Sequence, residues 1–347
     1  MNSPQNKIKA GILGATGAVG QKLISLLISH PLFEITALAA SEKSAGKKYS
    51  DACKWLEPLE LPQSISDMQV QLCKPGLDCK IVFSGLDSSV AGDVETEMAS
   101  AGYAVISNSK NHRMDVSVPL VIPEINSGHF ELIRSQSFPN GGFIVTNPNC
   151  AVVVLALALF PVYRTFGLKN IFVTTMQAIS GAGYPGVPSL DILGNVIPHI
   201  SDEEPKIESE LHKIFGSLNG SIAPADFNIS EMVNRVPVKD GHTVAVSFET
   251  QKKTDKDSII KAINDFNIEA KAQSGFDVIK YFDSPFRPQP LLDANANSGM
   301  TVSIGNLRQC NVLDWKLTAL GHNTIRGAAG AAIINAEYLL RKGFICS

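Results

Sequence analysis

The sequence contains no Cys-x-x-Cys pair, although it has six cysteines, at positions 53, 73, 79, 150, 310 and 346. Its seven histidines do not cluster with these cysteines at the spacing of zinc ligands, so we expect no metal site. The amino terminus carries no export signal, and scattered cysteines without one are typical of free thiols in a reducing compartment. We therefore expect a cytoplasmic protein without a disulfide framework.

Excess charge and long apolar runs are also lacking. The net charge is −3, which gives no basis for binding nucleic acid or a membrane surface. The apolar stretch from Ala151 to Val162 is shorter than the ~20 residues of a membrane span and runs into a proline. What remains is the composition of a globular protein of 347 residues, long enough for two domains of about 150 residues each.

Short β-type segments alternate with helical ones through the first half of the chain. We expect strands at 9–13, 34–40, 81–84 and 103–107, and helices at 19–29 and 90–101. Strands separated by helices form a parallel, doubly wound sheet, which binds ligands at the carboxyl ends of its strands. The first half therefore predicts a Rossmann-type α/β domain.

The second half is richer in long β-type segments, with few helices between them. These segments lie at 169–180, 233–238, 242–250, 276–281 and 300–309, and a closing helix is expected at 327–340. Such a pattern is typical of a mixed or antiparallel sheet with helices on one face. We therefore predict a second domain of the α+β class.

A glycine-rich turn connects the first expected strand to the first expected helix. It reads Gly11-Ile-Leu-Gly14-Ala-Thr-Gly17-Ala-Val-Gly20. Small residues at this place let the backbone approach a pyrophosphate at the helix N-terminus. The spacing is G-x-x-G-x-x-G, so a tight turn without a ligand remains the alternative. The cofactor contacts that we expect here come from Gly14, Ala15, Thr16, Gly17, Ala18 and Val19.

The end of the second expected strand indicates which dinucleotide is bound. It lacks the terminal acid that NAD-binding proteins usually place on the ribose, and continues as Ser41-Glu-Lys-Ser44. The hydroxyls of Ser41 and Ser44 and the ammonium of Lys43 suit a 2′-phosphate, whereas Glu42 suits a plain ribose or solvent. This segment favours NADP.

Cys150 follows Thr146-Asn-Pro-Asn149 and begins the apolar run. A cysteine at the start of a helix meets the positive end of the helix dipole and unpaired backbone N–H groups. Both favour a thiolate and supply donors for an oxyanion. Cys150 is therefore a candidate nucleophile, and the alternative is a buried structural cysteine.

Two further segments combine polar residues with glycine. In Arg235-Val-Pro-Val-Lys-Asp-Gly241-His242, the imidazole suits an acid or base and the guanidinium suits a carboxylate. A histidine in such a sequence is more often an ordinary surface or core residue, and an arginine is more often a solvated charge, so His242 and Arg235 alone do not establish a site. The segment from Gln177 to Pro188 holds three glycines and two prolines, which predicts a shaped loop around a ligand or a structural turn.

Together these segments resemble the aspartate-β-semialdehyde dehydrogenases, particularly the branch of archaea and fungi. The resemblance covers nearly the whole chain. Its motifs are G-A-T-G-A-V-G at 14–20, P-N-C at 148–150, S-G-A-G-Y-P-G-V at 180–187, E-E-P-K-I-E-S-E at 203–210, N-R-V-P-V-K-D-G-H at 234–242, R-P-Q-P at 287–290 and R-G-A-A-G at 326–330.

The resemblance implies a glyceraldehyde-3-phosphate dehydrogenase-like arrangement of two domains. Residues 1–149 would form the dinucleotide-binding domain, with 323–347 packing back onto it, and residues 150–322 the catalytic and dimerisation domain. It also implies a homodimer or a homotetramer. Further cofactor contacts are implied for Ser84, Gly85, Ser180, Gly181 and Asn323.

The resemblance assigns catalytic roles to Cys150 as the thioester-forming nucleophile, His242 as the acid/base and Gln177 beside the reacting carbon. Substrate contacts are implied for Asn149 next to the nucleophile, Arg235 on the α-carboxylate, Glu210 on the amino group, and Lys213 and Arg113 on phosphate. Two departures from the common pattern are Lys43 in place of a frequent arginine and Ala151-Val152 in place of small hydroxylated residues.

The reaction implied is the NADPH-dependent reductive dephosphorylation of L-4-aspartyl phosphate to L-aspartate 4-semialdehyde. An acyl phosphate reductase needs a soft nucleophile, a hydride donor, and cations for the phosphate. The alternatives are a malonyl-CoA reductase of the same fold and a dinucleotide sensor without chemistry. A reductase of N-acetyl-glutamyl phosphate is disfavoured, because its substrate has no free ammonium for Glu210. Small-molecule substrates, and neither nucleic acid nor membrane, are the expected partners.

Overall fold

The computed structural model describes residues 7–345, which form two compact units. Unit 1 comprises the chain up to Pro123, Gly128–Asn147 and the segment from Ala328 onwards, and unit 2 comprises Glu124–Ser127 and Pro148–Gly327. Each unit contains a six-stranded sheet, parallel in unit 1 and mixed in unit 2. The predicted fold class is therefore confirmed. Among the described residues, no helix is both long and apolar enough to cross a bilayer.

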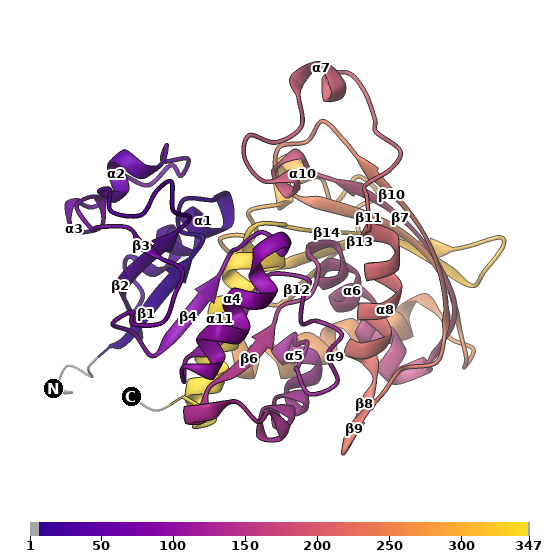
Figure 1. The fold of residues 1–347 in the computed structure, drawn as a ribbon. Coiled ribbons are helices and arrows are strands. Elements are labelled where there is room, and N and C mark those ends of the chain that lie inside the picture. Colours follow the sequence, from indigo (N-terminus) through magenta and orange to yellow (C-terminus); the bar gives the residue numbers. More distant parts are fainter. Residues whose placement is uncertain (1–6, 346–347) are drawn as a thin grey trace, which may run out of the picture. The chain divides into compact units, whose positions relative to one another are not determined.

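The sheet of unit 1 has the strand order β3-β2-β1-β4-β5-β6, and all neighbouring strands are parallel (Figure 1). Its strands are β1 Ile8–Leu13, β2 Phe33–Ala40, β3 Gln71–Leu72, β4 Ile81–Ser84, β5 Ala104–Ser107 and β6 Phe143–Thr146. Its helices are α1 Ala18–Leu27, α2 Tyr49–Ala52, α3 Gln63–Ser66, α4 Ser88–Ser100 and α11 Gly330–Arg341. Helix α5 Pro123–Asn126 and the 3₁₀ helix Ser127–Ser135 connect segments of the two units, and a 3₁₀ turn covers Pro139–Gly141.

Alternate residues of the parallel strands pack on opposite faces of the sheet, as a pleated strand requires. Ile12 of β1 belongs to a buried cluster that includes Leu23 of α1 and Ala336 of α11. Its neighbour Leu13 belongs to the cluster on the other face, with Met98 of α4. Because helices cover both faces, the strands are apolar over most of their length, and the exposed charges Lys9 and Glu34 lie near the start of β1 and β2.

The candidate cofactor loop lies where the strand order reverses, between β1 and β4. In a doubly wound sheet this switch point opens a crevice at the carboxyl ends of the two strands. Gly14 follows β1 with φ +74°, and a Cβ on it would lie 2.8 Å from the carbonyl oxygen of Gly85, which follows β4. The two loops therefore pack against each other by backbone, which only glycine at position 14 permits.

The sheet of unit 2 has the strand order β10-β7-β11-β14-β13-β12. The outer pairs β10–β7 and β12–β13 are parallel, and the inner pairs are antiparallel. The strands are β7 Leu168–Gln177, β10 Asn228–Arg235, β11 His242–Thr250, β12 Ile279–Phe282, β13 Val302–Gln309 and β14 Trp315–Gly321, and β8 Ser217–Asn219 pairs with β9 Ser221–Ala223 in a separate hairpin. The helices are α6 Cys150–Phe166, α7 Ser189–Ile192, α8 Glu203–Phe215, α9 Lys256–Ser274 and α10 Pro290–Asp293, with a 3₁₀ turn at Ile179–Ala182 and a π-helical turn at Ile325–Ala329.

Helix α6 is the centre of unit 2. All of its residues from Ala151 to Leu159 are buried, as expected of a helix that is apolar on every side. It packs on β11, β13 and β14, with α8 and α9 beside it (Figure 1). Asn149 is its N-cap, and the Oδ1 atom accepts hydrogen bonds from the N–H groups of Ala151 at 2.9 Å and Val152 at 3.4 Å. This cap fixes Cys150 as the first helical residue.

Three expectations for the second half were wrong in detail. The strand expected at 233–238 is β10, which ends at Arg235 because Pro237 follows and cannot donate a ladder hydrogen bond. The strand expected at 169–180 ends at Gln177, where the chain enters the 3₁₀ turn. Strand β14 and the helices α8 and α9 were not foreseen, so helices between the strands are more frequent than expected.

Candidate active site

Three strand ends bring candidate residues to one edge of the sheet in unit 2. Gln177 is the last residue of β7, and the parallel register pairs it with Arg235, the last residue of β10. His242 begins β11, which runs antiparallel to β7 and so starts where β7 ends. All three side chains belong to buried residues, with exposed fractions of 1%, 7% and 0%.

Cys150 lies against His242. The distance from its Sγ to Nε2 of the imidazole is 3.1 Å. Two glycines permit this contact by backbone packing: a Cβ on Gly327 would lie 2.6 Å from Cβ of Cys150, and one on Gly181 would lie 2.9 Å from Cε1 of His242. The structure thus brings together the two residues for which the sequence predicted nucleophile and acid/base roles.

The other ring nitrogen of His242 identifies the tautomer. The backbone N–H of Ala178 donates a hydrogen bond of 3.0 Å to Nδ1. A backbone N–H can only donate, so Nδ1 is the acceptor, and a neutral ring carries its proton on Nε2, facing Cys150. Burial, together with the positive charges of Arg235 and His322, lowers the pKa of His242 to about 3, against the opposing charge of Glu203. The ring is therefore neutral at neutral pH and presents an N–H donor to the sulfur.

The guanidinium of Arg235 is positioned by the same residue, Ala178, because its Nη1 donates to the carbonyl oxygen of Ala178 at 2.8 Å. Burial lowers the pKa of Arg235, while the charges of Cys150 and Glu203 raise it. A guanidinium remains charged through any such shift at neutral pH. It supplies a fixed positive charge beside the thiol and the imidazole.

Glu210 and Lys213 approach from α8. The backbone N–H of Asn149 donates to Oε2 of Glu210 at 2.6 Å, so this acid lies directly behind the nucleophile. Lys213 follows one helical turn later on the same face, and the two residues are 1% and 6% exposed. An acid and a cation are therefore buried on the helix that packs beside α6.

Glu203 is a site residue that the sequence did not single out. It is the first residue of α8, only 8% exposed, and its carboxylate contacts both Asn149 and Gln177. The one sequence signal for it is its spacing of seven residues from Glu210, two turns along the same helical face. The E-E-P-K-I-E-S-E motif at 203–210 contains both acids, but nothing in it indicates that Glu203 is buried.

The candidate cofactor residues after Gln177 also form a connected group in unit 2. Asn323 accepts from the N–H of Gly241 at 2.9 Å and donates to Oγ of Ser180 at 2.8 Å. Gly181 has no side chain and lies against His242. The loop is therefore fixed to the strand that carries His242.

In unit 1, the glycine loop has the shape of a cradle for phosphate groups. Gly17 is the N-cap of α1 and provides no side-chain acceptor for the first turn of the helix. A Cβ on Gly20 would collide with the carbonyl oxygen of Gly14, so the helix begins close against the loop. These residues fit a bound pyrophosphate. Ser41 and Lys43 are exposed, and the turn that they form is closed by the N–H of Ser44 donating to the carbonyl oxygen of Ser41 at 2.9 Å.

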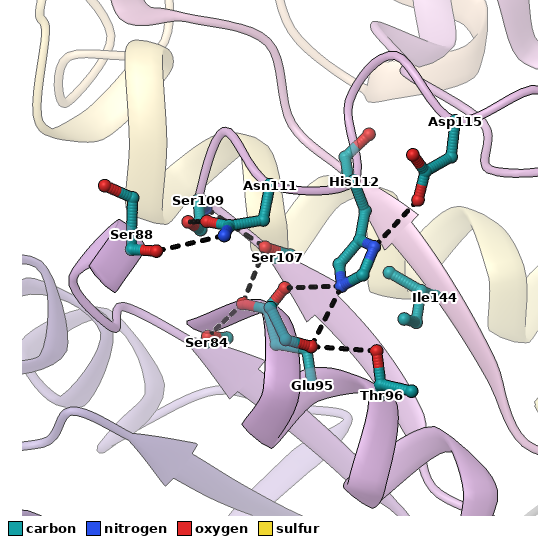
Figure 2. Close-up of polar contacts among 12 residues, drawn as sticks. Ser84, Ser88, Glu95, Thr96, Ser107, Ser109, Asn111, His112, Asp115 and Ile144 are labelled. Atoms are coloured by element: carbon teal, nitrogen blue, oxygen red, sulfur yellow. Dashed lines mark hydrogen bonds and ion pairs between the residues drawn. The ribbon is translucent and has the colours of Figure 1, made fainter. Parts of the chain in front are cut away.

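The hydroxyl of Ser84, an expected cofactor contact, is directed into a buried polar cluster that the sequence did not suggest (Figure 2). It donates to Oε1 of Glu95 at 2.6 Å, and Ser107 donates to the same oxygen at 2.8 Å. On the other side, Nε2 of His112 lies 3.9 Å from Oε2 of Glu95, and Nδ1 lies 2.8 Å from Asp115.

Arg113 follows His112 in the same segment and is 7% exposed. Its Nη2 donates to the carbonyl oxygen of Asn108 at 2.7 Å. Unit 1 therefore contains Arg113, whereas unit 2 contains the other residues expected to bind the substrate.

Among the residues that the structure describes, no group of three or more His, Cys, Asp or Glu side chains is arranged to hold a metal ion. None of the five cysteines in this part of the chain is joined in a disulfide.

Two family models match the chain. One is described as "Semialdehyde dehydrogenase, NAD binding domain" and matches residues 9–133. The other is described as "Semialdehyde dehydrogenase, dimerisation domain" and matches residues 159–326.

Named relatives are similar over nearly the whole chain. The aspartate-semialdehyde dehydrogenase of Archaeoglobus fulgidus is 45% identical over 343 residues, which cover 98% of this chain and 100% of that protein. The enzyme of the same name from Candida albicans is 44% identical and covers 97% and 99% of the two chains. Its crystal structure with NADP has a TM-score of 0.89 at 41% identity, with 98% and 100% coverage. A structure of aspartate semialdehyde dehydrogenase II from Vibrio cholerae has a TM-score of 0.77 at 27% identity, with 97% and 99% coverage.

Proposed function

The chain belongs to the aspartate-semialdehyde dehydrogenase family, and we propose that the buried site around Cys150 performs the reaction of that family. The protein is an NADP-dependent oxidoreductase that interconverts L-4-aspartyl phosphate and L-aspartate 4-semialdehyde. The reaction belongs to the biosynthesis of lysine, threonine, methionine and isoleucine. The observation that carries the proposed site is the 3.1 Å contact between Sγ of Cys150 and Nε2 of His242 at the start of α6.

Cys150 is the nucleophile of this proposal. Its sulfur attacks the acyl carbon of aspartyl phosphate, a C–S bond forms, and the C–O bond to phosphate breaks with the electron pair leaving on phosphate. The helix N-terminus, the guanidinium of Arg235 and the Nε2–H of His242 all stabilise negative charge at this sulfur. The resulting thioester is the species that is reduced.

NADPH, when bound, supplies the hydride that reduces the thioester carbon. The negative charge that develops on the substrate oxygen needs a hydrogen-bond donor, and His242 offers one on Nε2. Collapse of the reduced adduct breaks the C–S bond, releases the aldehyde and returns the sulfur as a thiolate. Gly14 to Val19, Ser41, Lys43, Ser44, Ser84 and Gly85 of unit 1, with Ser180, Gly181 and Asn323 of unit 2, are the residues proposed to hold the cofactor.

Charged residues account for the two ends of the substrate. Arg235 suits the α-carboxylate, because its fork offers two parallel donors, and Glu210 suits the ammonium. Lys213 and Arg113 are the proposed cations for phosphate. A substrate with both an ammonium and a carboxylate matches this set better than an acyl-CoA does, and the names of the relatives do not favour the alternative functions.

The remaining proposals concern domains, assembly and location. We propose a functional division near residues 149 and 150, a homodimer or a tetramer of dimers formed by the second domain, and a cytoplasmic location. The description of the second family model supports dimerisation, and the five free cysteines in the described part support a reducing compartment.

A spectrophotometric assay with aspartate semialdehyde, phosphate and NADP⁺ tests the proposal. We expect NADPH formation by the unmodified chain and none by Cys150→Ala, while Cys150→Ala still binds NADP with unchanged affinity. Cys150→Ser is also expected to be nearly inactive, because a hydroxyl is not ionised at neutral pH. Near-native turnover by Cys150→Ala would rule out covalent catalysis at this residue, and an inactive unmodified chain would refute the proposed reaction.

A further inference from the structure

The carboxylate of Glu203 accepts hydrogen bonds from the side chains of Asn149 before α6, Gln177 at the end of β7 and Lys206 in α8. Nδ2 of Asn149 lies 3.1 Å from Oε1 and 2.9 Å from Oε2. Nε2 of Gln177 donates to Oε2 at 3.1 Å, and Nζ of Lys206 donates to Oε1 at 2.8 Å. Asn149 precedes the nucleophile and Gln177 ends the strand beside it, so one carboxylate connects both.

An ionised carboxylate can only accept hydrogen bonds, so it determines which end of each amide faces it. The nitrogen of Asn149 faces Glu203, which directs its oxygen to the N–H groups of Ala151 and Val152, where it caps α6. The nitrogen of Gln177 likewise faces Glu203, and its oxygen is directed away. We propose that Glu203 is a positioning residue for the reaction of Cys150, because its carboxylate keeps the amides of Asn149 and Gln177 in one orientation each.

The proposal requires Glu203 to be ionised, and its partners provide for this. Burial alone would raise its pKa, but the hydrogen bond and charge of Lys206 and the amides of Asn149 and Gln177 lower it below the ordinary value of a glutamate. Other charged or titratable groups around the site include Cys150, Arg235, His242, His322, Glu210 and Lys213. Glu203 therefore stays an acceptor through the pH range of an activity assay.

Glu203→Gln is the informative variant, because it keeps the shape and places an NH₂ group opposite two other NH₂ groups. At least one amide must then turn or lose its partner. This inference rests on the proposed function, and it predicts a kcat about 10- to 100-fold lower, the effect of a small misplacement of reacting groups. The KM for phosphate is expected to stay within about twofold, since Glu203 holds Asn149 and Gln177 beside the nucleophile, whereas Lys213 and Arg113 are the cations proposed for phosphate.

Two control variants separate positioning from loss of charge. Glu204→Gln removes the same charge from the next residue of α8, and Lys206→Gln removes the ion-pair partner but leaves the carboxylate. Glu204→Gln is expected to keep kcat within about threefold, because the contacts of Glu203 with Asn149 and Gln177 remain. Lys206→Gln is expected to do so only where the pH exceeds the pKa of Glu203, which rises when the charge of Lys206 is removed. Glu203→Asp keeps the acceptor on a shorter side chain and is expected to restore part of the lost turnover.

A double-mutant cycle with Gln177→Met tests whether Glu203 acts through the amide. If it does, Glu203→Gln costs distinctly less in the Gln177→Met background than in the unmodified chain. Cys150 in each variant is also titrated with iodoacetamide. Alkylation is expected to proceed at an undiminished rate, because the thiol itself is intact and a neighbouring negative charge is gone.

The outcomes distinguish this inference from the proposed function. An active unmodified chain with an equally active Glu203→Gln variant, or fully additive effects in the cycle, would overturn the role of Glu203 alone. An inactive unmodified chain would overturn the proposed reaction and this inference with it. If Glu203→Gln does not fold, Glu203→Asp replaces it in the same cycle, and a kcat unchanged from the unmodified chain would again contradict the role.

Discussion

The imidazole of His242 is constrained at both nitrogens. The N–H of Ala178 occupies Nδ1, and Sγ of Cys150 lies 3.1 Å from Nε2. Protonation of both nitrogens would set the N–H of Ala178 against a second N–H, in a fully buried place and beside the guanidinium of Arg235. A neutral imidazole in such a setting acts as a hydrogen-bond donor to a developing oxyanion, without becoming an imidazolium.

This arrangement predicts different results for two variants of His242. His242→Ala removes the donor and is expected to lower kcat by roughly 10²–10⁴, with little change in KM. His242→Gln keeps an N–H donor at a similar distance from the backbone, so it is expected to retain distinctly more turnover than the alanine variant. Steady-state kinetics with each substrate varied in turn measures both effects. Equal losses in the two variants would show that the ring must carry a second proton.

Nitrogen-15 NMR of histidine-labelled protein tests the protonation state directly. Because the pKa of His242 is lowered to about 3, Nδ1 is expected to remain unprotonated and Nε2 protonated from pH 5 to pH 8. The spectrum of His242→Gln identifies the signal that belongs to this residue. A ring that titrates between these pH values would contradict the assignment of the tautomer.

Lys43 is the residue on which we base a prediction of cofactor choice. It lies exposed in the turn that follows β2 and carries a point charge, where a guanidinium would offer a fork. Lys43→Ala is expected to weaken NADP by about 10-fold and NAD by much less, because only NADP carries the 2′-phosphate. Fluorescence titration with each cofactor measures the two affinities, and Lys47→Ala, exposed in the same segment, is the control. An equal loss for NADP and NAD would mean that Lys43 does not contact the 2′-phosphate.

At the scale of elements, the cluster around Glu95 joins α4 to the ends of β4 and β5. Glu95 of α4 is fully buried, and it accepts from Ser84 and Ser107, the last residues of the two strands. The segment after β5 is fastened to the same helix, because Asn111 donates to the carbonyl oxygen of Ser88 at 3.0 Å. The cluster thus holds the segment with Asn111 and His112 against α4 (Figure 2).

The burial of Glu95 predicts a pH dependence of stability. Burial raises its pKa above the ordinary value of 4.5, although the hydroxyls of Ser84 and Ser107 and the charges of His112 and Arg113 oppose this. The folded state therefore binds the proton more tightly than the unfolded state does. The stability that this group contributes is complete below about pH 4.5 and is lost as the pH rises through the raised value.

Glu95→Gln removes this titration and keeps an acceptor oxygen for the two serines. Its free energy of unfolding, relative to that of the unmodified chain, is expected to rise as the pH increases from 4.5 to 8. Urea unfolding at several pH values measures the difference, and Glu97→Gln, exposed on the same helix, should show no such trend. A constant difference across this range would mean that Glu95 has the same pKa folded and unfolded.

The helices and strands could be predicted from the sequence where their formation depends on residues close by in the chain. The alternation of strands and helices gave the parallel sheet of unit 1, and the motifs gave the family correctly. The end of β10 was misplaced because Val236 and Val238 favour strands locally, whereas Pro237 and the register with β7 decide where pairing stops. Helix α9 has a weakly apolar sequence and is formed chiefly through its contacts with α6 and β12.

The candidate site shows the same limit. The helix start at Cys150 and the glycine beside His242 were readable in the sequence, since each depends on its neighbours in the chain. Glu203 depends on contacts with residues 54 and 26 positions away, Asn149 and Gln177. No short-range pattern reports such contacts, so the acid that connects the two amides could be found only from the folded chain.

At the scale of the whole molecule, one face of the sheet in unit 2 lacks a helical cover within the described chain. Helices α6, α8 and α9 contact the strands of this sheet. Phe172 of β7 and Met232 of β10 are 52% and 64% exposed. They border a hollow of about 260 Å³ that is also lined by residues of β11 and β14. A sheet face that exposes two large apolar side chains, in a segment that matches a dimerisation-domain model, is the surface we expect a second copy to cover.

Charge placed on this face should therefore separate the subunits. Phe172→Asp combined with Met232→Asp is expected to weaken the dimer by at least ~100-fold, because each substitution removes an apolar contact and places a carboxylate that loses its water in a symmetric interface. The monomer should still fold, since both side chains are already more than half exposed in the single chain. Light scattering coupled to size-exclusion chromatography measures the mass of the assembly, and circular dichroism tests whether the variant is folded.

Phe286→Asp, at a residue that is 78% exposed and lies outside this sheet, is the matched control and should leave the mass unchanged. A double variant that keeps the mass of the unmodified assembly would show that the subunits associate through another surface.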